Sequence, residues 1–104
     1  MELLFISGSN KELNVEKTKL KKLKRLNVEE YFEHEKNFTN KECLFIIDKN
    51  SVKEENIDRI RKGKKPEFII LLSDTLDWDK LIETFEKGET FYVKPIKEED
   101  FKNL

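Results

Sequence analysis

The feature that most constrains this chain is a set of short, uninterrupted apolar runs, each followed by polar or glycine residues. The clearest lie within Leu3–Ile6, Cys43–Ile47 and Glu67–Leu72. A short continuous run of this kind is typical of a strand that is buried on both faces. Segments with helical spacing separate the runs. The alternation predicts an α/β fold, with a parallel sheet covered by helices on both faces.

Three helices are expected between the strands. The first follows a capping-box signature at Ser9 and Glu12 and ends near Leu26-Asn27, and the second repeats that signature at Ser51 and Glu54. Gly63 suits the C-terminal end of the second helix. The third helix carries apolar residues at i, i+3, i+4 and i+7, so these side chains are expected to pack inward. Its apolar positions are Trp78, Leu81, Ile82 and Phe85, and Gly88 ends it.

The other segments are less regular. Val28–Glu33 alternates loosely and is predicted to be a second strand near a sheet edge. Lys36–Glu42 has room for one helical turn at most. Thr90–Val93 is predicted to be the fifth strand, and Glu98–Leu104 a short last helix. No internal repeat or linker divides the chain, so residues 1–104 are expected to form one domain.

Composition excludes several classes of function. The formal net charge is −1, which gives no sign of a nucleic-acid-binding surface. The basic segment Lys11–Arg25 is amphipathic and is interpreted as a solvated helix face. No signal peptide or membrane-spanning stretch is recognisable, so a cytoplasmic location is expected. Cys43, the only cysteine, is expected to be buried, and His34 to lie on the surface without a metal.

Three polar residues stand where predicted strands end. Asp48 follows the third strand, Ser73 the fourth and Lys94 the fifth. Each alone is also explained as a turn residue, a helix cap or a solvated side chain. A parallel sheet, however, brings all three to one edge. A carboxylate, a hydroxyl and an ammonium together suit a phosphoryl group, with Asp48 as acceptor.

These residues carry a resemblance to a known family. Phe45-Ile46-Ile47-Asp48, the strand ending in Ser73, and Val93-Lys94-Pro95 together resemble the receiver domain of response regulators. The resemblance implies a flavodoxin-like, doubly wound five-stranded sheet of order 2-1-3-4-5. It also implies that Asp48 is the phosphoacceptor, Ser73 the switch hydroxyl and Lys94 the phosphoryl-contacting lysine. The Lys94-Pro95 bond would be cis, and Phe91, rather than Tyr92, would occupy the switch-aromatic position.

The sequence departs from that family at the metal site. Receivers carry a pair of acidic residues directly after the first strand, whereas this chain has Ser7 and Gly8 there. Mg²⁺ prefers carboxylate oxygens, so we expect weak or absent Mg²⁺ binding and no cofactor. Loss of the metal would severely slow phosphorylation of Asp48. The segment before the third strand is also too short for a normal second helix.

The leading hypothesis is therefore a degenerate receiver, or pseudo-receiver, that regulates by binding protein and has no enzymatic activity. Its partner would be a kinase, an output domain or a second copy, not nucleic acid or membrane. By resemblance, the binding surface would include Glu86, Lys87, Tyr92, Lys97 and Glu98. One alternative is a working receiver that is phosphorylated on Asp48. A second is a flavodoxin-like domain that binds an anion or nucleotide with Ser7-Gly8-Ser9.

Overall fold

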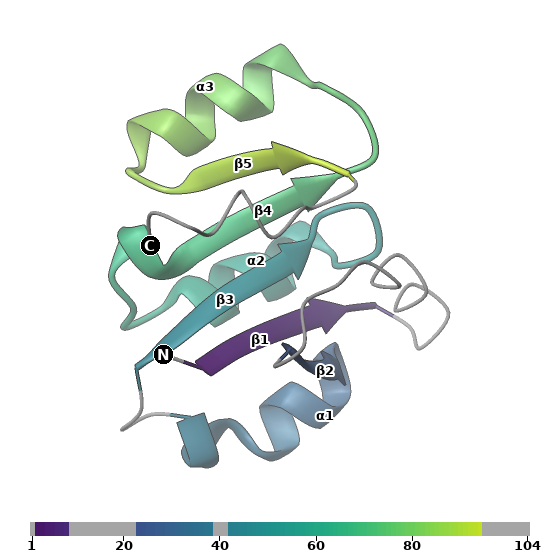
Figure 1. Cartoon of the computed structure of the whole chain (residues 1–104), viewed down its shortest axis with the longest axis vertical. Coiled ribbons are helices and arrows are strands. Elements are labelled where there is room, and N and C mark those ends of the chain that lie inside the picture. The colour runs from purple at the N-terminus through teal and green to yellow at the C-terminus, as the bar shows by residue number, and fades with distance from the viewer. Residues whose placement is uncertain (1, 9–22, 39–41, 95–104) are drawn as a thin grey trace.

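The protein contains one five-stranded parallel sheet of order β2-β1-β3-β4-β5. The computed structural model describes residues 2–8, 23–38 and 42–94. All four strand pairings are parallel, and from β2 onward the strands alternate with helices along the chain (Figure 1). The topology is flavodoxin-like, as the sequence predicted. Every strand therefore ends at the same edge of the sheet, here called the carboxyl edge, opposite to the amino edge.

The central strands form where the apolar runs predicted them. Every residue of β3 (Cys43–Asp48) and β4 (Ile69–Ser73) is buried, as expected for strands covered on both faces. β1 (Glu2–Ser7) lies between β2 and β3, and β5 (Thr90–Val93) forms the far edge. A 3-10 turn, η3 (Pro66–Phe68), leads into β4.

The second strand and the helix after it were predicted wrongly. β2 spans Leu23–Asn27, where a helix was expected to end, and Val28–Glu33 forms the helix α1 rather than a strand. Asn27 caps α1: its side chain accepts from the Glu30 N–H, and the Glu30 carboxylate accepts from the Asn27 N–H. The backbone pairing of β2 with β1 outweighed the helical spacing of the leucines.

Two predictions about this region nevertheless hold. β2 does lie at a sheet edge. The helix before β3 is short: α1 has six residues and is followed only by the 3-10 turn η2 (Glu35–Phe38). The expected capping box at Ser9 and helix at Glu98–Leu104 lie outside the described residues, as does the Lys94-Pro95 bond.

Helix α2 spans Glu54–Arg61, but it does not use the predicted capping box. Its N-cap is Lys53, which makes no side-chain capping bond. The Ser51 hydroxyl is engaged elsewhere, by the Gly8 N–H and the Asp48 carboxylate. Gly63 follows the helix with φ +78, a conformation that favours glycine, so its predicted terminating role is confirmed.

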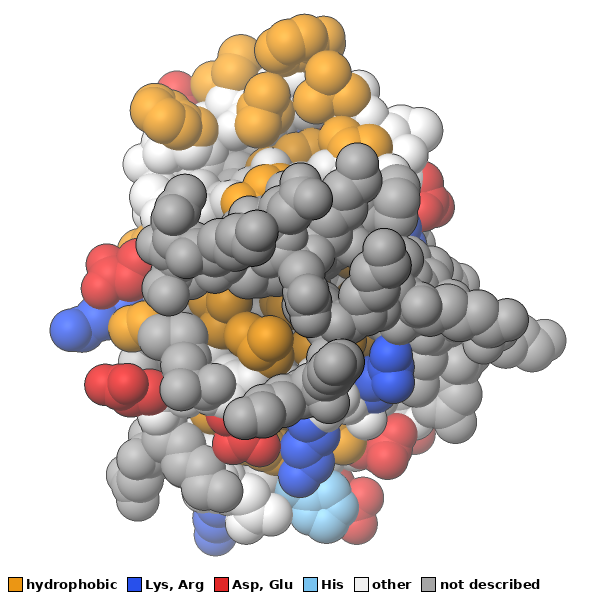
Figure 2. Space-filling view, viewed as in Figure 1, with side chains coloured by type: hydrophobic (Ala, Val, Ile, Leu, Met, Phe, Trp, Pro, Cys, Tyr) orange, Lys and Arg blue, Asp and Glu red, His pale blue; other side chains and the backbone are white. Residues whose placement is uncertain are grey.

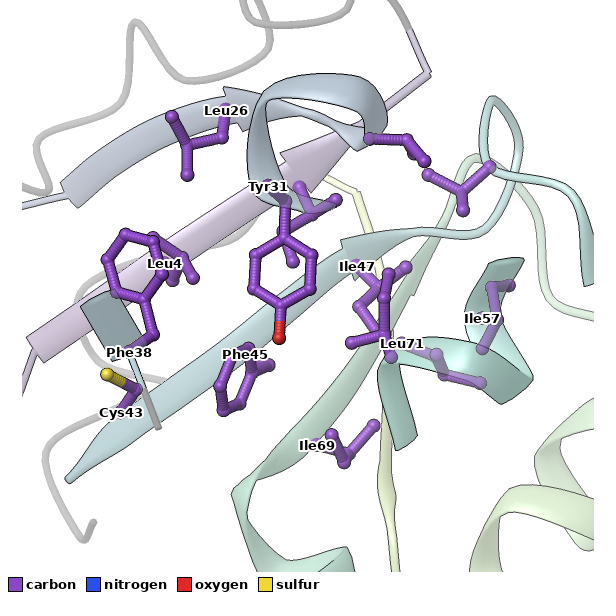
Figure 3. Packing of buried hydrophobic residues seen from close by; sticks show 14 residues of the cluster. Leu4, Leu26, Tyr31, Phe38, Cys43, Phe45, Ile47, Ile57, Ile69 and Leu71 are labelled. Atoms are coloured by element: carbon purple, nitrogen blue, oxygen red, sulfur yellow. The ribbon is translucent and has the colours of Figure 1, made fainter. Parts of the chain in front are cut away.

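Two hydrophobic clusters fill the two faces of the sheet. The larger joins alternate residues of β1, β3 and β4 to α1, η2 and α2, with Tyr31 and Phe45 near its centre (Figure 3). The smaller contains Phe5, Ile46 and Ile70 on the opposite face. Cys43 is buried in the larger cluster, as predicted. Within the described residues, no helix is long and apolar enough to span a membrane.

Candidate functional site

The carboxyl edge brings together two of the three predicted site residues. Lys94 Nζ lies 2.8 Å from Asp48 Oδ1 in an ion pair. The Asp48 side chain is fully buried and that of Lys94 is only 7% exposed. The pair forms because β3 and β5 both end at this edge, on either side of β4. The predicted convergence of these two strand ends is therefore correct.

Both carboxylate oxygens of Asp48 have partners within the protein. Oδ1 accepts from the Asn50 N–H at 3.2 Å, in addition to its contact with Lys94. Oδ2 accepts from the Ser51 hydroxyl at 2.7 Å. An acceptor carboxylate must be exposed to attack phosphorus. In this arrangement Asp48 is closed off from solvent and held by donors of its own loop.

Ser7 and Gly8 stand where the receiver resemblance implies an acidic pair. Ser7 is buried, and the Gly8 N–H donates to Ser51 Oγ at 2.8 Å. A Cβ atom on Gly8 would lie 2.0 Å from the Ser51 carbonyl oxygen, so no larger residue fits without backbone movement. Among the residues that the structure describes, no group of three His, Cys, Asp or Glu side chains is arranged for a metal.

Asp74 completes the surroundings of Lys94. Its carboxylate Oδ1 lies 3.1 Å from Lys94 Nζ, and its N–H donates to the Asn50 side chain at 2.6 Å. Burial by itself would lower the pKa of Lys94, but the Asp48 and Asp74 carboxylates outweigh this effect and raise the pKa above its usual value. Lys94 is therefore a firmly charged ammonium that is shared by two carboxylates.

Ser73 and Phe91 lie near this pair without joining it. Ser73 is buried at the end of β4, and its hydroxyl lies 3.4 Å from the Thr75 N–H. Phe91 pairs in register with Leu71 and packs against the larger core cluster. Phe91 thus lies two strand positions before Val93, on a partly buried face of β5. Among the described residues, the Ser73 hydroxyl makes no hydrogen bond with Asp48.

Two residues of this site were missed by sequence reasoning. Ser51 was taken for a helix cap, although its position three residues after Asp48 also allows a hydrogen bond back to that carboxylate. Asp74 directly follows the strand-end residue Ser73, which was a usable signal for a second carboxylate at the edge. Both were overlooked because local capping patterns explained them first.

The second notable surface is the outer face of α3 (Trp78–Glu86), which packs beside β5. The apolar side of α3 faces outward, and a more polar side faces the protein. Thr84 is the residue of α3 that is buried, whereas Trp78 is 66% exposed, Ile82 53% and Phe85 80%. The prediction that Trp78 packs inward is therefore wrong. Lys80 Nζ lies 3.8 Å from Glu54 Oε2 of α2. A polar face of α3 is therefore turned toward the protein.

Large exposed apolar side chains gather in this region, here called the α3 patch. Figure 2 shows hydrophobic side chains gathered over α3 and the adjoining strand. The exposed members are Leu76, Trp78, Ile82, Phe85 and Val93. Monomeric proteins rarely expose so many large apolar side chains together without a binding role.

The predicted binding surface and this patch only partly coincide. Glu86 and Lys87 lie at the end of α3 and are exposed. Tyr92 is partly buried against the smaller core cluster. Lys97 and Glu98 lie outside the described residues.

The fold defines a flavodoxin-like α/β protein, and the comparisons with known proteins add no closer relationship. No family model matches the chain, and no curated protein or solved structure matches it significantly.

Proposed function

We propose that this protein is a receiver-like regulatory module that acts by binding another protein through the α3 patch. The observation that carries the proposal is the inverted amphipathicity of α3, which buries Thr84 and exposes Trp78, Ile82 and Phe85. Burying an apolar side chain of this size against a partner contributes about 1.5–3 kcal/mol. A cytoplasmic location and a role in signalling belong to the same proposal.

The closed carboxyl edge supports a function that does not depend on phosphorylation. Lys94 already neutralises Asp48, and Gly8 leaves no room for a metal-binding carboxylate at its position. In this proposal the Asp48–Lys94 pair serves to hold the ends of β3 and β5 together, beside the patch. Regulation then comes from the presence of the partner, with Mg²⁺-dependent chemistry weak or absent.

The test is site-specific photo-cross-linking in cells that naturally make the protein. A cross-linking residue at Phe85 on α3 is compared with one at Glu55, an exposed position on α2. We expect one defined partner, or a second copy, to be captured from position 85 and not from position 55. With the purified partner, Phe85→Ala should weaken binding by about tenfold or more. Equal cross-linking from both positions, or unchanged affinity of the variant, would contradict the proposal.

A phosphorylated receiver is the second candidate, because Asp48 and Lys94 lie together at the carboxyl edge, where the resemblance implies the phosphoacceptor and its lysine. This hypothesis predicts that a phosphoryl mimic such as beryllofluoride with Mg²⁺ shifts the amide signals of Ser73 and Phe91. No shift at millimolar mimic would count against it. The anion-binding alternative has less support, because the Gly8 N–H already donates to Ser51.

A further inference from the structure

A pocket of about 250 Å³ opens at the amino edge of the sheet, away from Asp48 and Lys94. Its walls combine aromatic and charged side chains and come from α1, η2, the start of β3, the loop after α2 and η3. The centroid of the Tyr31 ring lies 6.1 Å from that of Phe38, in a stacked arrangement, and 6.0 Å from that of Phe45, edge-on. Figure 3 shows the three residues as neighbours in the core. The aromatic residues that line the pocket are Tyr31, Phe38, Phe45 and Phe68.

Lys64 supplies a cation to this aromatic pocket. Its Nζ lies 4.9 Å from the centre of the Phe45 ring and 5.6 Å from that of Tyr31, and it donates to the Ile60 carbonyl. Burial lowers the pKa of Lys64, and the neighbouring Glu35 only partly offsets this effect. Burial therefore disfavours the charged form of Lys64, and the contacts of the ammonium compensate only in part for the lost hydration.

Two other partly buried cations, Arg61 and Lys94, are compensated by carboxylates. Arg61 Nε lies 2.8 Å from Glu89, and Lys94 Nζ lies 2.8 Å from Asp48. For Lys64, no carboxylate oxygen of the described residues lies within the 4.0 Å that defines an ion pair. Lys64 keeps N–H groups that an anion can accept in charge-assisted hydrogen bonds.

The pocket also has a suitable size for one aromatic ring. An apolar cavity of about 150 Å³ is enough to hold benzene, so about 250 Å³ holds a substituted ring. Glu42 and Lys62 at the rim are both exposed, so water screens their charges. Glu35 and Lys64 are the half-buried charges of the lining, and the Glu35 carboxylate lies beyond ion-pair distance of the Lys64 ammonium, which stays able to bind an anion.

From this geometry we propose that the amino-edge pocket binds a monocyclic aromatic carboxylate. The ring would lie among Phe38, Phe45 and Phe68, and the carboxylate would accept hydrogen bonds from Lys64 Nζ. This site is independent of the α3 patch and of the Asp48–Lys94 pair, so it goes beyond the proposed function.

The test is an NMR titration of the isotope-labelled protein with benzoate, benzyl alcohol and benzylamine. These probes share one ring and differ in charge. We expect benzoate to bind in the millimolar range, as suits so few atoms, and to shift the amides of Phe45, Gly63 and Lys64. Benzyl alcohol and benzylamine should bind at least about fivefold more weakly. Tighter binding of benzylamine, or no binding of benzoate at about 10 mM, would overturn the proposal.

A matched pair of variants assigns the preference to one ammonium. Lys64→Met keeps the aliphatic stem and removes the charge, so benzoate should then bind no better than benzyl alcohol. Lys62→Met makes the same change at the exposed rim and should leave the preference intact, and Lys64→Arg should retain it. The spectra themselves report whether each variant folds. Unchanged benzoate affinity in Lys64→Met, or shifts confined to other surfaces, would refute the assignment.

Discussion

Lys94 and Lys64 lie at opposite edges of one parallel sheet, and the protein surrounds their ammonium groups in different ways. At the carboxyl edge, Lys94 contacts Asp48 at 2.8 Å and Asp74 at 3.1 Å. At the amino edge, Lys64 lies over aromatic rings and donates to a backbone carbonyl. Both lysines are desolvated, but only Lys94 has carboxylates of the described residues within ion-pair distance, whereas Glu35 offsets the desolvation of Lys64 only in part. The pKa of Lys94 is therefore raised, whereas that of Lys64 is lowered.

Within the described residues, the two edges differ in whether the buried ammonium has a carboxylate partner: Lys94 has one and Lys64 does not. The carboxyl edge, where the receiver resemblance places the chemistry, is filled by its own side chains: Ser51 bonds Asp48, and Gly8 packs against Ser51. The amino edge, for which the resemblance implies no function, has a pocket and an ammonium without a carboxylate partner. The residues that most resemble a receiver site, Asp48 and Lys94, contact each other in this structure.

The largest expected effect comes from breaking the buried ion pair. Asp48→Asn leaves the Lys94 ammonium buried beside a neutral amide, so we expect the free energy of unfolding to fall by about 3 kcal/mol. Asp74→Asn removes the other carboxylate, whose side chain is 59% exposed, and should cost less than about 1 kcal/mol. Urea denaturation midpoints measure both. Equal losses for the two variants would show that the burial of Asp48 does not matter.

The next effect comes from the tight packing at Gly8. A Cβ atom there meets the Ser51 backbone, so Gly8→Ala should cost about 2 kcal/mol or more. Gly63→Ala is the matched control: its φ of +78 is unfavourable for alanine, but no atom lies within 4 Å of the new Cβ. This control should cost about 1 kcal/mol. Thermal unfolding of both variants compares steric overlap with backbone strain, and a harmless Gly8→Ala would contradict the packing described at this edge.

The smallest effect is a pH dependence of opposite sign at the two edges. Lys94 binds its proton more tightly when folded, so its contribution is complete below pH 10.5, the ordinary lysine value, and is lost as the pH rises through its raised pKa. Lys64 releases its proton earlier when folded, so stability rises with pH from its lowered pKa toward 10.5. Urea midpoints of the wild type, Lys94→Met and Lys64→Met between about pH 8 and pH 12 measure both trends. If the contributions of Lys94 and Lys64 to stability changed with pH in the same direction, the different environments described for the two lysines would be contradicted.

Much of this architecture was predictable from the sequence. The runs in β1, β3 and β4 specified buried parallel strands, and the strand ends correctly placed Asp48 beside Lys94. The region around β2 was not predictable from periodicity, because its five residues fit a helical stripe as well as a strand. Only pairing with β1 decides between them, although the Asn27–Glu30 capping box was a readable start signal for α1.

Other features depend on contacts between distant segments. The spacing of Trp78, Ile82 and Phe85 predicts an amphipathic helix, but not that its apolar side faces outward. That orientation depends on how α3 meets β5 and α2. Likewise, the amino-edge pocket combines Tyr31 with Lys64, which are far apart in the sequence and approach only through the packing of α1 and α2 against the sheet.

The most direct test of the closed carboxyl edge is incubation of the purified protein with acetyl phosphate and Mg²⁺, followed by intact-mass spectrometry. Asp48 is buried, its two carboxylate oxygens are engaged, and Gly8 has no side chain for a metal. We therefore predict that the mass of the wild-type protein stays unchanged. Stoichiometric addition of one phosphoryl group, absent from the Asp48→Asn variant, would contradict the account.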